Sequence, residues 1–267
     1  VADLERPERF LRILTRPQWK SWLTRGAFIL IGFSLVCTLW FAMELGAQLG
    51  WLSDGIAVAA RVPLMMLGFP LALMTAIYTA FLFGQCEGRD LWQSRLMPWH
   101  MGVQAVMAGG ATLLVLQQLQ IQLQLPGWGH PAPATVWYTF FIAGALDLVF
   151  RWMEVTMRHN TSNGSQAAWI LRKGPERRRW RGSMLIGGFA VLAPVAFGAI
   201  SLKWFYGQQE RLGDRFDQVA QTKLDVQFSA LLTGWLSLLT LAGILALLGL
   251  FLYESAIIKA GQDVPNA

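Results

Sequence analysis

Six long stretches of the chain are apolar almost throughout, and polar or basic residues separate them. The hydrocarbon core of a membrane is about 30 Å thick and needs about 20 apolar residues for each helix. Backbone groups inside it must be paired within the segment, and the six stretches lack the alternation of barrel strands. The pattern predicts an all-α, polytopic transmembrane helix bundle with six spans in this chain, over residues 27–45, 56–83, 97–119, 134–157, 184–204 and 229–253.

Composition excludes the other broad classes of protein. The chain is 54% hydrophobic and only 14% charged, whereas a soluble domain is about 25% charged. The same apolar excess excludes a disordered chain. Two cysteines, Cys37 and Cys86, are too few for a disulfide scaffold. Two glycine pairs, Gly109–Gly110 and Gly187–Gly188, indicate close packing between helices.

The lysines and arginines predict which side of the membrane each loop faces. In the connections and at the ends of the predicted spans, 16 of them lie on one side and 4 on the other, and the basic side is normally cytoplasmic. Both ends of this chain are therefore predicted to be cytoplasmic. We expect residues 1–26 to be a cytoplasmic interfacial segment, 27–258 the bundle and 259–267 a cytoplasmic tail, with one short helix in the outer connection 206–228. Because the net charge of +6 reports topology, nucleic acid is not an expected partner.

Ionisable residues inside a membrane are costly, and three of them share one predicted span. Asp147, Arg151 and Glu154 follow a spacing of i, i+4 and i+7, which places them on one face of a helix. One interpretation is a proton path through the bundle. The other is an ion-pair cluster that only fixes the packing.

Two further charged groups lie near the ends of the predicted spans. Glu44 and Arg61 both fall near the outer boundary, where they could pair, bind a polar headgroup such as a quinone ring, or extend to the interface. Glu87, Arg89 and Asp90 follow the second span at the inner surface, and we interpret them as a structural clasp.

The chain lacks the residues that would bind its own haem or metal. His100, His130 and His159 do not place two imidazoles in the membrane at matching depth, which a b-type haem would require. Cys37 and Cys86 form no CxxC signature. A phosphate-binding GxxxxGK[ST] loop is also absent.

Two stretches resemble one known family of membrane proteins. Residues 3–30 read DLERPERFLRILTRPQWKSWLTRGAFIL, and residues 79–94 read TAFLFGQCEGRDLWQS. Both are similar to the NrfD/PsrC family, the polysulfide reductase-type integral membrane subunit. One hairpin of two helices separates them, which also fits the family.

The resemblance implies a quinone/quinol-interacting anchor subunit of a respiratory oxidoreductase complex in the bacterial inner membrane. Such subunits pass electrons between the quinone pool and a partner iron–sulfur subunit of the 4Fe-4S ferredoxin type. That partner connects to a molybdopterin or multihaem cytochrome subunit, and related subunits occur in the quinol-oxidising alternative complex III. The implied ligand is an exchangeable menaquinone or ubiquinone, without haem or metal in this chain. Glu44 and Arg61 lie at the depth of the family's quinone pocket, and Asp147, Arg151 and Glu154 would carry protons, with proton translocation as a further implication.

One departure from the family pattern keeps other functions open. In the family, the stretch that begins here at Asp3 follows two transmembrane helices, so we expect a bundle larger than these six spans. Those two helices could be missing from this sequence, lie in another chain or be lost. The alternatives are a secondary transporter or proton-conducting membrane protein, and a purely structural membrane anchor. Six spans without a clear inverted repeat argue against the transporter.

Overall fold

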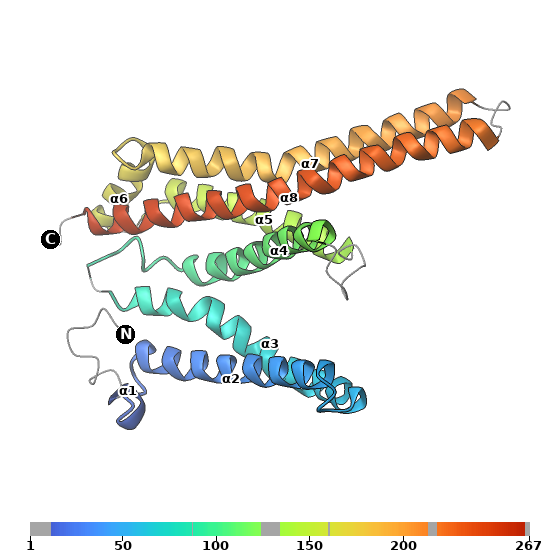
Figure 1. Cartoon of the computed structure of the whole chain (residues 1–267). Coiled ribbons are helices and arrows are strands. Elements are labelled where there is room, and N and C mark those ends of the chain that lie inside the picture. Colours follow the sequence, from blue (N-terminus) through green and yellow to red (C-terminus); the bar gives the residue numbers. More distant parts are fainter. Residues whose placement is uncertain (1–11, 87, 124–133, 160, 213–217, 265–267) are drawn as a thin grey trace. The chain divides into compact units, whose positions relative to one another are not determined.

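The computed structural model describes residues 12–86, 88–123, 134–159, 161–212 and 218–264. These residues form helices and connecting turns, and no strand occurs among them. In chain order the helices are α1 (Arg12–Thr15), α2 (Trp22–Gln48), α3 (Asp54–Gly84), α4 (Met97–Leu123), α5 (Ala134–Thr156), α6 (Ser162–Arg172), α7 (Arg177–Leu212) and α8 (Gln218–Gln262) (Figure 1).

Among the described residues, six helices are long and apolar enough to cross a membrane, which confirms the prediction of an all-α polytopic bundle. They are α2, α3, α4, α5, α7 and α8. The chain divides into two compact units, Val1–Gly102 and Val103–Ala267. Unit 1 contains α1 to α3 and the start of α4, and unit 2 contains the rest.

In unit 1, the two stretches that carry the family resemblance contact each other. The backbone N–H of Trp22, at the start of α2, donates to Oε1 of Gln85 at the end of α3, at 3.0 Å. The Trp22 ring stacks on the Phe81 ring with centroids 4.3 Å apart. A side chain at Gly26 would meet the Tyr78 ring, so glycine allows α2 and α3 to approach there. The two motifs therefore join the beginning of one span to the end of the next.

In unit 2, α4, α5, α7 and α8 share one tightly packed core. Its buried residues are mostly small: Met107, Ala111, Leu114, Phe140, Ala143, Ala190, Ala242 and Ala246. A Cβ on Gly144 would lie 2.7 Å from Cγ2 of Val191, so α5 and α7 are in close contact there. In each of the two glycine pairs, only one glycine faces a neighbouring helix. A Cβ on Gly110 or Gly187 would meet a neighbouring side chain, whereas a Cβ on Gly109 or Gly188 would meet no atom within 4 Å. Small residues thus set the distance between these helices, as is common in membranes.

The prediction of a separate short helix in the outer connection 206–228 was wrong for the residues that the structure describes. Instead, α7 continues to Leu212 and α8 begins at Gln218, so the polar residues extend the two spans. At 36 and 45 residues, they would measure about 54 and 68 Å at the usual rise. The polar ends are rich in Gln and hold no proline, which favours a continuing helix. The two helices lie side by side along their length (Figure 1).

We expect Gly243→Ala to destabilise the folded chain. A Cβ on Gly243 would lie 2.8 Å from the backbone oxygen of Ala111, and a backbone atom cannot rotate away. Overpacking of this kind costs about 1–3 kcal/mol, which should appear as a lower thermal midpoint of the chain in detergent. The control Gly109→Ala adds the same methyl group in open space and should raise stability by about 0.5–1 kcal/mol. Equal behaviour of the two variants would contradict the packing described here.

Candidate functional site

The side chain of Arg151 on α5 is buried in unit 2, with no exposure to solvent. Its Nη2 is 2.5 Å from Oδ2 of Asp147, one helical turn earlier on α5. Both side chains are almost fully buried. The predicted shared face of Asp147, Arg151 and Glu154 therefore points into the helix bundle, because all three residues are buried.

Arg151 also joins α5 to two other spans. Its Nη1 donates to the backbone oxygen of Ser183 on α7, at 3.3 Å, and to that of Gly249 on α8, at 3.1 Å. A Cβ on Gly249 would lie 3.3 Å from both the Ser183 oxygen and the Gly187 nitrogen. Glycine at this position therefore lets the α7 and α8 backbones approach where the guanidinium reaches them.

Tyr253 on α8 completes the cluster, and it is absent from the set of residues predicted from the spacing on α5. Its hydroxyl donates a hydrogen bond to Oε2 of Glu154, and its ring lies 4.9 Å from the Arg151 Cζ. The sequence does contain a feature that could have indicated Tyr253, because a tyrosine in an apolar span needs a hydrogen-bond partner. The predicted topology runs α5 and α8 in the same direction, so Glu154 and Tyr253 fall at similar depth.

The arrangement places the Arg151 guanidinium against the Asp147 carboxyl and the Tyr253 ring, and the Tyr253 hydroxyl bonds a second buried carboxyl, that of Glu154. Such a cluster is costly to bury and needs every partner in place. The Nε of Arg151 has no hydrogen-bond partner among the described residues. Gain or loss of one proton by a carboxyl group would change the buried charge by one unit, which is the chemical capacity that a proton carrier requires.

A second charged site lies in unit 1, between α2 and α3. Arg61 holds Glu44 with two hydrogen bonds, from Nε to Oε1 at 2.6 Å and from Nη2 to Oε2 at 2.8 Å. The indole N–H of Trp40 donates to the same Oε1 at 3.3 Å. The side chains are 51% exposed for Arg61 and 33% for Glu44. The sequence left open whether Glu44 and Arg61 pair, bind a headgroup or extend to the interface. The structure shows that they pair, and both side chains remain partly exposed on the surface of unit 1.

The predicted clasp after α3 is described only in part. Glu87 lies outside the described residues. Arg89 and Asp90 are half-buried in a turn, where their backbone oxygens accept from Trp92 at 2.9 Å and Gln93 at 3.2 Å. Their clasp role stays a prediction. The contact that joins this turn to α2 comes from Gln85, which the sequence analysis quoted within the motif but did not assign a role.

The site residues come from both units and do not resemble a metal centre. Among the residues that the structure describes, no three His, Cys, Asp or Glu side chains gather as possible metal ligands. Cys37 and Cys86 are free thiols. The described site residues are held together by ion pairs and hydrogen bonds.

The six spans and their charged clusters define a polytopic membrane protein with polar sites at span depth. Residues 1–124 match the family model of polysulphide reductase, NrfD, which confirms the resemblance carried by residues 3–30 and 79–94. No curated protein and no solved structure matches this chain.

We expect Arg151→Leu to destabilise the fold by about 3–5 kcal/mol, because it leaves two buried carboxyl groups without their cation. The double variant Asp147→Leu/Arg151→Leu removes one of those carboxyls together with the guanidinium. It should be more stable than Arg151→Leu alone, as measured by thermal unfolding in detergent. Arg95→Leu, at an exposed arginine, serves as the control. A double variant as unstable as the sum of both single variants would contradict the pairing.

Proposed function

We propose that this chain is the quinone/quinol-interacting membrane subunit of a respiratory oxidoreductase complex. It would pass electrons between the quinone pool and a partner iron–sulfur subunit, which in turn connects to a molybdopterin or multihaem cytochrome subunit. The observation that carries the proposal is the family match over residues 1–124, because that stretch includes both helices that hold the Glu44–Arg61 pair.

The Glu44–Arg61 pair has the chemistry to recognise a quinone or a quinol. A quinone ring offers two carbonyl acceptors, and Arg61 has N–H groups on Nη1 beyond those it uses for Glu44. A quinol offers two O–H donors, for which the Glu44 carboxylate is an acceptor and a general base. The pair lies within two turns of the end of α2 and two turns of the start of α3, so a ring could reach it from the membrane interface.

Oxidation of a quinol releases two protons with its two electrons, so the subunit needs groups that can carry protons. We assign this role to the buried cluster of Asp147, Arg151 and Glu154, and add Tyr253 to it. The Tyr253 hydroxyl is hydrogen-bonded to Glu154, and Arg151 contacts Asp147 and the Tyr253 ring. These contacts form a polar connection between α5 and α8 inside an apolar bundle.

We expect Glu44→Gln and Arg61→Ala to lower quinol turnover by the intact complex, mainly by raising the KM for quinol. Turnover is measured with a soluble quinol analogue and the complex's own electron acceptor. The control Glu210→Gln removes an exposed carboxylate from α7 and should leave turnover unchanged.

The exchanged pair Glu44→Arg/Arg61→Glu separates ligand binding from helix packing. It restores an ion pair between α2 and α3 but reverses the positions of donor and acceptor. If the pair binds quinone, the exchanged variant assembles and turnover stays low. Full recovery of turnover would show that the pair only holds the helices together, and the chain would then be a structural anchor.

We expect Asp147→Asn to reduce proton uptake while the complex still assembles. The amide oxygen can still accept a hydrogen bond from Arg151, but the cluster then holds one cation and one carboxylate and loses a protonatable group. Uptake is followed with a pH-sensitive dye during turnover in liposomes, with Asp225→Asn on the exposed part of α8 as the control. Unchanged uptake in an assembled Asp147→Asn complex would remove this residue from the path.

A further inference from the structure

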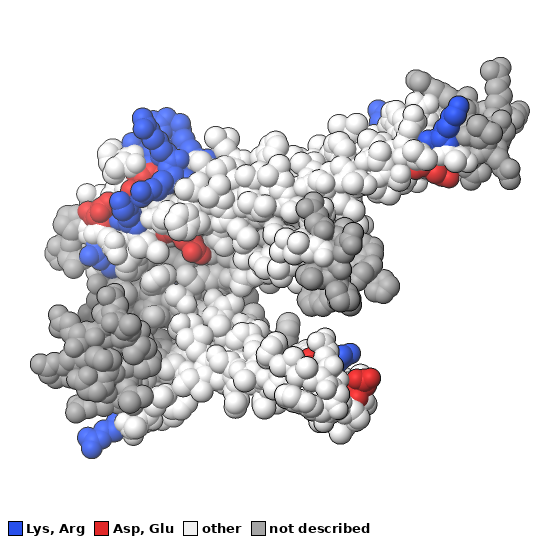
Figure 2. Space-filling view, in the orientation of Figure 1, with Lys and Arg blue, Asp and Glu red and all other residues white. Residues whose placement is uncertain are grey.

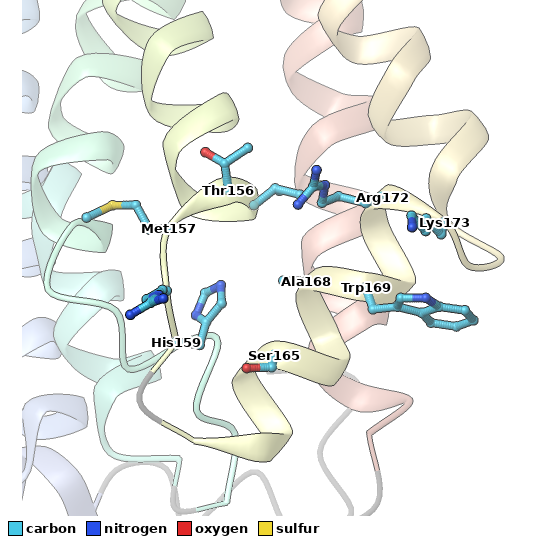
Figure 3. Close-up of a pocket in the computed structure, with 10 residues that line it drawn as sticks. Thr156, Met157, His159, Ser165, Ala168, Trp169, Arg172 and Lys173 are labelled. Atoms are coloured by element: carbon cyan, nitrogen blue, oxygen red, sulfur yellow. The ribbon is translucent and has the colours of Figure 1, made fainter.

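A basic cleft of about 340 Å³ lies in unit 2, between the end of α5 and helix α6. Figure 3 shows Arg172 extending from α6 toward Thr156, with His159 and Ser165 lining the cleft below them in the view. Arg158 and Lys173 complete the basic lining. None of these residues belongs to the charged clusters within the spans.

The cationic side chains of this cleft have no anionic partner in the part of the chain that the structure describes. Arg158, Arg172 and Lys173 are exposed, and none pairs with a carboxylate among the described residues. By contrast, Arg179 in the same region is held by Glu176 at 3.0 Å. Three cations that share one hollow without a counter-ion repel one another, so an anion placed between them would be stabilised.

His159 lines the cleft and packs against Gly164. The Nε2 of His159 is buried and has no hydrogen-bond partner among the described residues. A Cβ on Gly164 would lie 3.0 Å from the His159 Cβ, so glycine allows the imidazole to pack against the start of α6. The Thr161 side chain accepts from the Gly164 N–H at 3.2 Å and fixes this turn. The cleft therefore offers a preformed donor position beside its cations.

The cleft lies at the end of two helices that are long and apolar enough to cross a membrane. Helix α5 ends at Thr156 and α7 begins at Arg177, so residues 157–176 connect these two helices at that end. In α6, Leu171 is buried against the bundle, whereas Trp169 at the cleft is 55% exposed, as an interfacial anchor would be. Figure 2 shows Lys and Arg gathered over the end of unit 2 that holds α6 and the start of α7.

We propose that this cleft binds the phosphate group of an anionic phospholipid. Arg172 and Arg158 would hold the phosphate oxygens, His159 would donate from Nε2, and the acyl chains would lie along the apolar surface of α5 and α6. A membrane source is favoured over free phosphate because the exposed Met157 and Trp169 border the basic lining. Basic pockets at the ends of spanning helices are suited to anionic headgroups.

The test is native mass spectrometry of the full chain released from detergent, with added phosphatidylglycerol, phosphatidylcholine or inorganic phosphate. Arg172→Gln should weaken retention of phosphatidylglycerol about fivefold or more. Arg172→Lys keeps the charge but loses the planar fork, so it should fall between Arg172→Gln and the unmodified chain. Arg158→Gln provides a second variant with the same expected loss.

Lys259→Gln is the matched control, because Lys259 lies exposed in the last turn of α8, which contacts α6. Its retention of phosphatidylglycerol should stay within about twofold, since a charge outside the cleft contributes only a screened attraction. Three results would overturn the proposal: equal losses in Arg172→Gln and Lys259→Gln, equal retention of phosphatidylglycerol and phosphatidylcholine, or arginine-dependent binding of inorganic phosphate without lipid.

Discussion

The packing of unit 2 depends on satisfying one buried guanidinium. Arg151 brings a positive charge into the interior of the unit, and its side chain is fully buried. Its two terminal nitrogens find partners on three helices: a carboxylate on α5, a carbonyl on α7 and a carbonyl on α8. Those carbonyls come within reach only because α7 and α8 approach each other at Gly249. The burial of Arg151 therefore depends on the glycine at position 249. Any substitution that separates α7 from α8 also removes hydrogen-bond partners from Arg151.

The two charged sites use the same chemical groups in opposite environments. Arg151 is surrounded by protein, so its carboxylate partner is a fixed part of the fold, and the cost of removing either partner is high. Arg61 holds Glu44 with equally short hydrogen bonds but is half exposed, so little burial would be lost if a ligand replaced part of the contact. This difference is why we assign the exchangeable ligand to unit 1 and the fixed proton carriers to unit 2.

Hydropathy was sufficient for the six spans because an apolar stretch of about 20 residues has few alternatives to a membrane helix. It did not give the lengths of α7 and α8, since hydropathy reports where the membrane ends, whereas a helix continues as long as its residues favour it. The spacing of Asp147, Arg151 and Glu154 showed a shared face, because those residues lie on one helix. Tyr253, Ser183 and Gly249 come from other helices, and a single sequence does not show which helices are neighbours.

The basic residues between α5 and α7 indicate more than the orientation of the chain, because the structure places some of them together in one cleft. Counting Lys and Arg treats every residue in the connection between α5 and α7 alike and gives only an orientation. The structure distinguishes them: Arg179 is neutralised by Glu176, whereas Arg158, Arg172 and Lys173 converge on a hollow without a carboxylate among the described residues. Orientation alone requires no such convergence, because scattered charges would serve it equally well. A hollow that concentrates unneutralised cations at the end of a spanning helix lowers the stability of the free protein, and an anionic headgroup is the ligand that would offset that repulsion.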